Sequence, residues 1–329
     1  MLEITNVVRG DVLCGLSLKV ENNGIYGVLT ADGRAATALA EAICGCENAD
    51  SGEVVINGEP MSRKAIELKK KVRLVPKSLD IDKNTTPVEY MDFIGQVLGV
   101  DTDKRYRQIK EALELMAIED VQNRPVSDLS AAQLLRVSIA ASLIGNPEVI
   151  VLDDPFGGVE EKALSRVLET VTMLGSIKTL VLLSHKVAHV KELCREVTVM
   201  CGGKVVLSGE VSEIESKINS TCELHICVRG EYEKVSAAIE GVDGVVGVKL
   251  LSAERNNVNQ IRVEHLPDSR MKDKLFAALS AVGAPMLSVK PIVLTIEDVF
   301  YSLTEKDRSR PCEKTENAEN KTKRRGRKK

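Results

Sequence analysis

Hydrophobic and polar positions follow two periods along the chain, one typical of strands and one typical of helices. Strand-like runs occupy residues 2–8, 12–20 and 25–29, and the second alternates apolar with polar side chains as a half-buried strand does. Residues 149–152 are wholly apolar and residues 179–183 are apolar after Thr179, which is typical of buried parallel strands, and a helical pattern separates the two runs. Apolar strands that alternate with helices build a mostly parallel sheet covered on both faces, so the pattern predicts an α/β fold.

The pattern changes near residue 220. From there strands and helices follow in the order βαββαβ, over residues 224–228, 232–239, 245–251, 260–264, 271–282 and 286–290, with a last amphipathic helix over 296–303. This order is that of the split βαβ, ferredoxin-like α+β arrangement. We therefore expect one domain over residues 1–220, a second over 221–304, and a polar, lysine-rich, disordered tail over 305–329.

Composition narrows the class of protein. The 329 residues are 43% hydrophobic and 28% charged, as in soluble globular chains. Aromatic residues make up 3% and Trp is absent, which argues against base-stacking platforms for nucleic acid. No apolar run approaches the roughly 20 residues that span a bilayer, and the first residues have a strand pattern rather than that of a signal peptide. We expect a cytoplasmic chain.

Charge is distributed unevenly. The net charge is −3, yet residues 321–329 carry seven basic and no acidic side chains, which leaves 38 basic and 48 acidic groups elsewhere. Such a basic tail is either a flexible solvated end or a segment attracted to anionic lipid, at about 1 kcal/mol per basic residue near the surface.

The candidate chemistry begins at residue 24, where a strand, a glycine-containing turn and a helix expected over residues 37–44 follow one another. That order is typical of a phosphate-binding loop, whose pattern is G-x-x-x-x-G-K-[ST]. Here Thr30 stands at the first glycine, Ala35 at the second and Ala36 at the lysine, and only Thr37 is kept.

Four further motifs follow at informative spacing: Pro-Lys at 76–77, Leu-Ser-x-x-Gln from 129, Asp-Asp-Pro at 153–155 and Ser-His at 184–185. In this order they resemble the nucleotide-binding subunit of ABC transporters, over residues 1–220. The resemblance implies a P-loop NTPase domain with an antiparallel β subdomain and a helical subdomain. The βαββαβ segment that ends in residues 294–303 resembles the C-terminal domain of the ABC-2 exporter subfamily (drug, antibiotic and gliding-type exporters).

The resemblance implies ATP and Mg²⁺ as ligands and gives each motif a role. The residues that would surround the nucleotide phosphates are Thr30, Ala31, Asp32, Gly33, Arg34, Ala35, Ala36, Thr37 and Ala38. Thr37 and Asp153 would hold the magnesium ion, since both offer the hard oxygen ligands that it requires. Lys77 stands where the family has a metal-linked glutamine, and Asp154 stands where it has a water-orienting glutamate. His185 matches the residue that senses the γ-phosphate, and Ser130 matches the signature serine that faces it.

The departures from the family pattern predict weak or absent ATP hydrolysis. Ala36 removes the ammonium that neutralises the phosphates, and the Cβ atoms of Thr30 and Ala35 hinder their close approach. The carboxylate of Asp154 is one methylene short, and a displacement of about 1 Å can cost roughly a hundredfold in rate. Arg34 is either a substitute for the missing lysine or an exposed arginine at the loop.

Two readings of function remain open. The favoured one is a membrane-peripheral subunit of an ABC-2 exporter at the inner face of the cell membrane. It would couple ATP state to a separate transmembrane permease and form a heterodimer with an intact ATP-binding subunit. The alternative is a non-catalytic regulatory or scaffold protein that keeps the fold and binds no nucleotide. Action on nucleic acid is disfavoured, because such relatives usually carry two ATPase domains in one chain.

Overall fold

The structure, a computed structural model, describes residues 1–329 except 22, 63, 219–221, 255–256, 293–294 and 308–329. The chain divides into two compact units, one of Met1–Val211 with the segment from Phe300, and one of Ser212–Val299. The expected basic tail beyond Asp307 lies outside the described residues. The expected domain boundaries stay a prediction.

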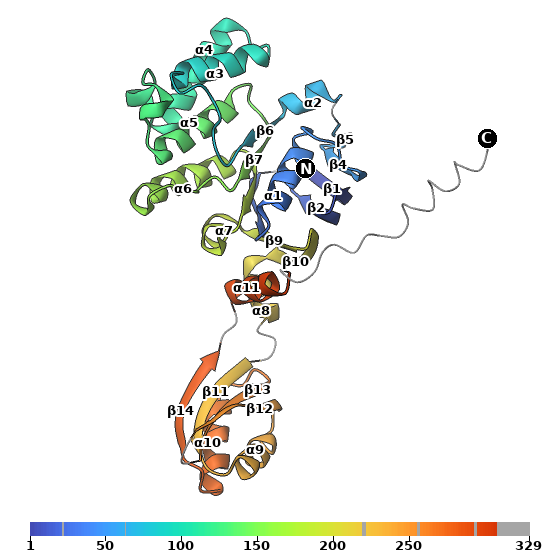
Figure 1. The fold of residues 1–329 in the computed structure, drawn as a ribbon, viewed down its shortest axis with the longest axis vertical. Coiled ribbons are helices and arrows are strands. Elements are labelled where there is room, and N and C mark those ends of the chain that lie inside the picture. Colours follow the sequence, from blue (N-terminus) through green and yellow to red (C-terminus); the bar gives the residue numbers. More distant parts are fainter. Residues whose placement is uncertain (22, 63, 219–221, 255–256, 293–294, 308–329) are drawn as a thin grey trace, which may run out of the picture. The chain divides into compact units, whose positions relative to one another are not determined.

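A six-stranded sheet forms the centre of the first unit (Figure 1). Its strand order is β10 (Lys204–Glu210), β9 (Glu196–Cys201), β3 (Gly24–Thr30), β8 (Thr179–Ser184), β7 (Val149–Asp153) and β6 (Val72–Val75). All neighbours are parallel except the edge pair β9–β10. Every residue of β7 and β8 is buried, which explains why these two strands are apolar without alternation.

Helices cover both faces of this sheet. Helix α1 (Gly33–Ile43) packs on one face together with Val28 of β3, and Leu39 and Ile43 are fully buried there. Burial of each such side chain contributes about 1.5–3 kcal/mol. The neighbouring Gly27 faces the other side, against Val190 of α7 (Val187–Leu193), because successive strand residues point to opposite faces. Helix α6 (Glu161–Gly175) packs on β3 and β8.

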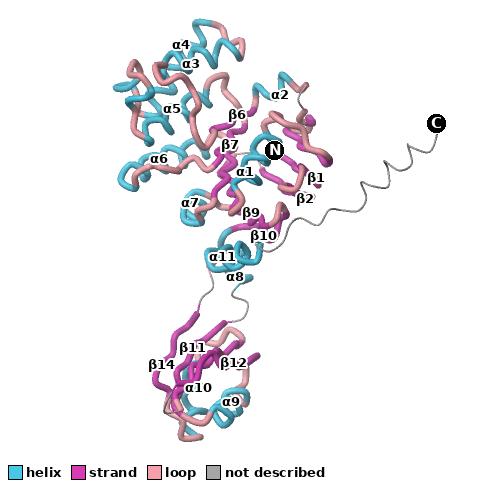
Figure 2. The backbone as a smooth tube through the Cα atoms, viewed as in Figure 1, coloured by secondary structure: helices cyan, strands magenta, loops and turns pink. Residues whose placement is uncertain are grey.

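An antiparallel sheet and a helical region complete the first unit. The sheet order is β2 (Leu13–Val20), β1 (Leu2–Arg9), β4 (Ser51–Ile56) and β5 (Glu59–Pro60), and it shares the core of α1. The helices after β5 are α2 (Ile66–Lys70), α3 (Pro87–Val97), α4 (Thr102–Met116) and α5 (Ala131–Leu143), with short 3₁₀ turns at Glu119–Val121 and Val126–Asp128. Figure 2 shows α3, α4 and α5 as one helical group. The α/β fold with these two subdomains is the one expected.

The second unit is a four-stranded antiparallel sheet with two helices. Its elements are β11 (Cys222–Arg229), α9 (Tyr232–Glu240), β12 (Val245–Glu254), β13 (Val258–His265), α10 (Met271–Ala281) and β14 (Met286–Ile292). The strand order is β12-β13-β11-β14, and both helices contribute to one buried core. The order of elements is βαββαβ, and kinship with ferredoxin-like domains stays a prediction. Helices α8 (Val211–Ile218) and α11 (Ile296–Asp307) flank the unit in sequence.

The expected ends of two helices were wrong. Helix α1 begins at Gly33 rather than Thr37, because Asp32 caps its N-terminus and draws residues 33–36 into the first turn. Helix α11 continues to Asp307, four residues beyond the expected helix end at residue 303.

Candidate functional site

The candidate site lies where three adjacent parallel strands end. In the order β3-β8-β7, Leu29 pairs with Ser184, and Leu183 pairs with Asp153. The chain leaves β3 at Thr30 and turns directly into α1. Because the carboxyl ends of parallel strands share one edge, the glycine-containing turn, the Asp-Asp pair and the Ser-His pair meet there.

A carboxylate of the chain itself occupies the N-terminus of α1. Asp32 Oδ1 accepts a hydrogen bond from the backbone N–H of Arg34 at 2.9 Å, and the Arg34 guanidinium lies 3.3 Å from Asp32 Oδ2. Partial burial acts to raise the pKa of Asp32, but the hydrogen bonds from Arg34 outweigh it and lower the pKa. The positive end of the helix, which attracts phosphate in nucleotide-binding loops, is therefore already paired with an anion.

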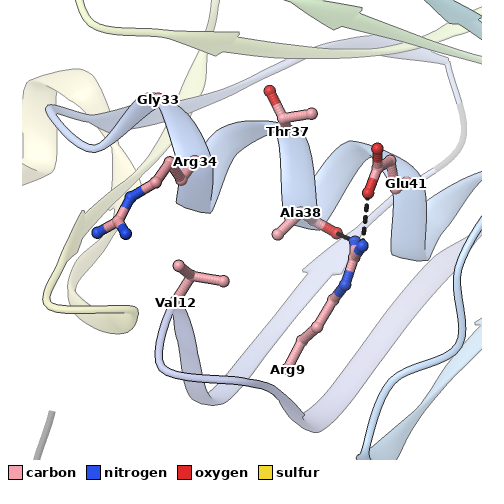
Figure 3. Close-up of a pocket in the computed structure, with 7 residues that line it drawn as sticks. All are labelled: Arg9, Val12, Gly33, Arg34, Thr37, Ala38 and Glu41. Carbon is pink, nitrogen blue, oxygen red and sulfur yellow. Dashed lines mark hydrogen bonds and ion pairs between the residues drawn. The ribbon is translucent and has the colours of Figure 1, made fainter.

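The lysine position of the loop faces the protein core. Ala35 and Ala36 are 1% and 5% exposed and belong to the cluster that also contains Val28 and Leu39. A methyl group in that cluster offers no charge to a phosphate. The Arg34 side chain turns to Asp32, away from Thr37, and its role as a substitute for the lysine stays a prediction (Figure 3).

Thr37 and Asp153 form a direct hydrogen bond. Thr37 Oγ1 donates to Asp153 Oδ2 at 2.8 Å, across the gap between α1 and β7. Asp153 is buried, and this burial raises the pKa of its carboxyl against the lowering effect of the Thr37 hydrogen bond. The two expected metal ligands thus lie together and satisfy each other.

Asp154 lies between two nitrogen groups. Its Oδ2 is 3.1 Å from Lys77 Nζ and its Oδ1 is 2.9 Å from His185 Nδ1. The Asp154 side chain is 15% exposed, whereas those of Lys77 and His185 are more than half exposed. Asp154 also has a positive φ of 44°, a conformation that few non-glycine residues adopt and that marks functional turns. Both oxygens of the candidate catalytic carboxylate are engaged.

A shallow pocket of about 430 Å³ runs along α1 beside this site (Figure 3). Its lining residues are Arg9, Val12, Gly33, Arg34, Thr37, Ala38 and Glu41, with no aromatic ring among them. Arg9 is held on the flank of α1, where it donates to the carbonyl oxygen of Ala38 at 3.0 Å and pairs with Glu41 at 2.6 Å. The wall of the pocket therefore consists of aliphatic and charged side chains, and it offers no aromatic ring on which a nucleotide base could stack.

Ser130 begins helix α5 in the helical region. Its hydroxyl accepts from the Gln133 backbone N–H at 3.3 Å, while Gln133 Oε1 accepts from the Ser130 backbone N–H at 3.0 Å. This reciprocal capping box explains the Ser-x-x-Gln spacing on structural grounds alone.

Comparison with known proteins identifies relatives of this chain. The family model described as ABC transporter matches residues 13–157. An energy-coupling factor transporter ATP-binding protein EcfA of Methanoculleus marisnigri is 31% identical over 218 residues, which cover 64% of this chain and 79% of that protein. The chain belongs to the ABC transporter family.

Two ABC relatives match nearly the whole chain. The linearmycin resistance ATP-binding protein LnrL of Bacillus subtilis is 22% identical over 92% of this chain and 98% of its own length. The Nod factor export ATP-binding protein I of Cupriavidus metallidurans is 26% identical over 92% and 97%. Among solved structures, a nucleotide-free ATP-binding cassette superposes with a TM-score of 0.59 at 21% identity, over 66% of this chain and 94% of that one. The expected family and its ABC ATPase fold are confirmed.

ATP-binding domains of this family bind nucleotide and commonly require Mg²⁺. One solved cassette, with a TM-score of 0.57 at 20% identity over 64% of this chain and 98% of that one, is a dimer bound to ADP and Pi. In the present chain Thr37 and Asp153 offer suitable oxygen ligands. The charges around these two residues do not fit a bound magnesium nucleotide. Asp32 brings a negative charge to the phosphate end, and Ala36 supplies no positive charge there. Lys77 holds an ammonium beside the Asp-Asp pair, where the metal ion would lie. Within the described residues, no group of three or more His, Cys, Asp or Glu side chains could hold a metal ion.

The structure brings some predicted site residues together and separates another. Thr37 lies with Asp153, and Lys77 and His185 lie on Asp154, while Ser130 is at the start of α5. The roles of these residues stay a prediction. Sequence reasoning missed the pairing of Lys77 with Asp154 and the capping by Asp32. An acidic residue directly before the first helical residue is a recognisable start signal, so the cap could have been found.

Proposed function

We propose that this chain is a catalytically degenerate ATP-binding subunit of an ABC-2-type exporter. It would act beside a membrane permease and pair with a second, intact ATP-binding subunit at the cytoplasmic face of the membrane. The observation that carries the export assignment is the near full-length match to two proteins named for resistance and export, because it extends through the second unit. The ABC-2 subfamily rests on the same match.

The geometry of the site supports the degenerate character. An active site of this kind needs a carboxylate free to orient water and a positive charge at the phosphates. Here Asp154 is held by Lys77 and His185, and Ala36 leaves the phosphate end without an ammonium. A heterodimer would compensate for the missing catalytic groups, since an intact partner would supply its own phosphate-binding loop opposite Ser130 of this chain.

ATP hydrolysis by purified components tests the proposal. We expect background activity from this chain alone and clear activity when it is reconstituted with a permease and an intact subunit. In that complex Ser130→Ala should lower the rate, whereas Lys162→Gln, an exposed change on α6, should leave it unchanged. Hydrolysis by the isolated chain at an ordinary transporter rate would overturn the proposal.

The capping of α1 by Asp32 favours one alternative, a scaffold whose fold is kept and whose own site binds no nucleotide. Thermal unfolding separates the two cases. A ligand at 100 times its Kd stabilises the folded state by about 2.7 kcal/mol. Stabilisation of the heterodimer by Mg-ATP supports the exporter subunit, and its absence in every combination supports the scaffold.

No helix in the described part of the chain has the length and apolar character to cross a membrane. We propose that attachment to the membrane comes from the permease, with an added contribution from the basic residues 321–329 and anionic lipid. Deletion of residues 308–329 should weaken binding to anionic vesicles at low salt, and unchanged binding would remove the lipid contact.

A further inference from the structure

The ammonium group of Lys77 lies beside the Asp-Asp pair at the end of β7. Strands β6 and β7 are parallel neighbours, and Val75 pairs with Leu152. Lys77 and Asp154 each lie two residues beyond that pair, so the register itself carries the lysine to the carboxylate. The resulting Lys77 Nζ to Asp154 Oδ2 distance is 3.1 Å.

The two carboxylates at the end of β7 form a concentration of negative charge. Asp153 is 5% exposed and the side chain of Asp154 is 15% exposed, so water screens neither of them well. Buried like charges in adjacent positions are costly unless a cation lies beside them. In a metal-dependent site that cation is divalent. Among the described residues, Lys77 is the one lysine or arginine recorded in a salt bridge with either carboxylate, and the other recorded partner is His185, which is a cation only when protonated.

We propose that Lys77 is a tethered cation that takes the place of a divalent metal ion beside Asp153 and Asp154. At the other end of the site, the Asp32 carboxylate occupies the helix N-terminus where a phosphate would lie. The chain thereby supplies both charges of a metal–phosphate pair from its own side chains. This deepens the proposed function, on which it rests: the chain's own side chains supply a cation and an anion to the site without ligand, and exchange of nucleotide is left to the partner's loop.

The tethering geometry explains how one lysine suffices. Asp154 accepts from Lys77 on one oxygen and contacts His185 on the other, while Thr37 satisfies one oxygen of Asp153. Lys77, His185 and Thr37 thus contact carboxylate oxygens that a metal ion would otherwise coordinate. A metal ion entering this cluster would have to displace or lie against the ammonium.

Binding of Mn²⁺ alone, measured by water-proton relaxation on the full chain, tests the proposal. A unit charge about 4 Å from a divalent ion weakens its binding about thirtyfold in water, and somewhat less at physiological salt. We expect Lys77→Gln to bind Mn²⁺ about tenfold to thirtyfold more tightly than the wild type. Lys77→Arg should behave as the wild type, and so should Lys83→Gln, a change of an exposed lysine.

Thermal stability gives a second readout that a merely structural role would not produce. Lys77→Gln should lower Tm in EDTA and recover it in millimolar Mg²⁺ or Mn²⁺, whereas the wild type should show no such rescue. The double variant Lys77→Gln with Asp153→Asn should lose both the Mn²⁺ signal and the rescue.

Equal Mn²⁺ affinity of wild type and Lys77→Gln overturns the tethered cation, as does a Tm drop in Lys77→Gln that no divalent ion reverses. These outcomes leave the exporter proposal intact, because that proposal is decided by hydrolysis in the reconstituted complex. A complex without activity would remove the proposed function while the Mn²⁺ result stands by itself.

Discussion

Replacement of Asp32 by alanine tests whether the chain's own carboxylate closes the anion site. The substitution removes the 2.9 Å hydrogen bond to the Arg34 backbone N–H and the negative charge at the helix N-terminus. Loss of an N-cap side chain costs about 0.5–2 kcal/mol, and loss of an anion at this end about 0.3–1 kcal/mol. The ion pair with Arg34 adds little, because that guanidinium is 74% exposed.

We therefore expect Asp32→Ala to lower the free energy of unfolding of the first unit by about 2 kcal/mol, or Tm by roughly 4–8 °C. Asp32→Asn is the matched control, because asparagine caps helices as well as aspartate does and removes only the charge. It should remain within about 1 kcal/mol of the wild type.

Calorimetric unfolding in the presence and absence of inorganic phosphate is the assay. Phosphate and the Asp32 carboxylate compete for the same N–H groups, so phosphate should stabilise Asp32→Ala more than the wild type. Equal Tm values for the alanine and asparagine variants would refute the capping argument. A wild-type chain that phosphate stabilises as strongly as Asp32→Ala would refute the closed anion site.

Three further predictions concern other parts of the first unit. Burial raises the pKa of Asp153, so its carboxyl stabilises the fold at pH values below the ordinary pKa of 3.8, and this contribution is lost as pH rises through the folded-state pKa. Asp153→Asn should therefore raise Tm at pH 7 and lose that advantage near pH 4. Thermal unfolding scans at a series of pH values measure this. Ser130→Ala should lower stability by about 1 kcal/mol and Gln133→Ala by less, measured by urea unfolding, since only the first removes the N-cap oxygen. A Cβ at Gly27 would lie 2.5 Å from Val190 Cγ1, so Gly27→Ala should cost about 1–3 kcal/mol, and adding Val190→Ala should recover part of it.

The parallel core could be predicted because it is encoded locally. Runs 149–152 and 179–183 are apolar on both faces, and only a strand between two helical layers buries both. Strands β9 and β10 were not predicted, since their run of residues 196–210 mixes a buried and a half-exposed strand. Strand β9 takes its place in the sheet by pairing with β3, which is distant in sequence, and β10 pairs with β9.

The position of the candidate site could also be predicted, because strand ends in a parallel sheet share one edge. The predicted start of α1 is four residues too late, because Asp32 acts as a helix cap and not as a loop residue. The contact between Lys77 and Asp154 joins residues 77 positions apart and depends on the register of β6 against β7. No local pattern contains that register, so the charge balance of the site appears only in the folded chain.

The residues that this site keeps are those that also satisfy buried groups. Thr37 supplies the hydrogen bond that the buried Asp153 carboxylate needs, and removing such a partner leaves a desolvated acceptor at a cost of about 1–3 kcal/mol. Asp154 and His185 satisfy each other in the same way. The lysine replaced by Ala36 has no such partner, since that position packs into an apolar cluster that a methyl group fills. Once Asp153 is present, retention of Thr37 is therefore explained by the hydrogen bond that this carboxylate needs, without metal binding. That is why Mn²⁺ binding, rather than the presence of Thr37 and Asp153, has to decide whether this chain's own site still holds a metal ion.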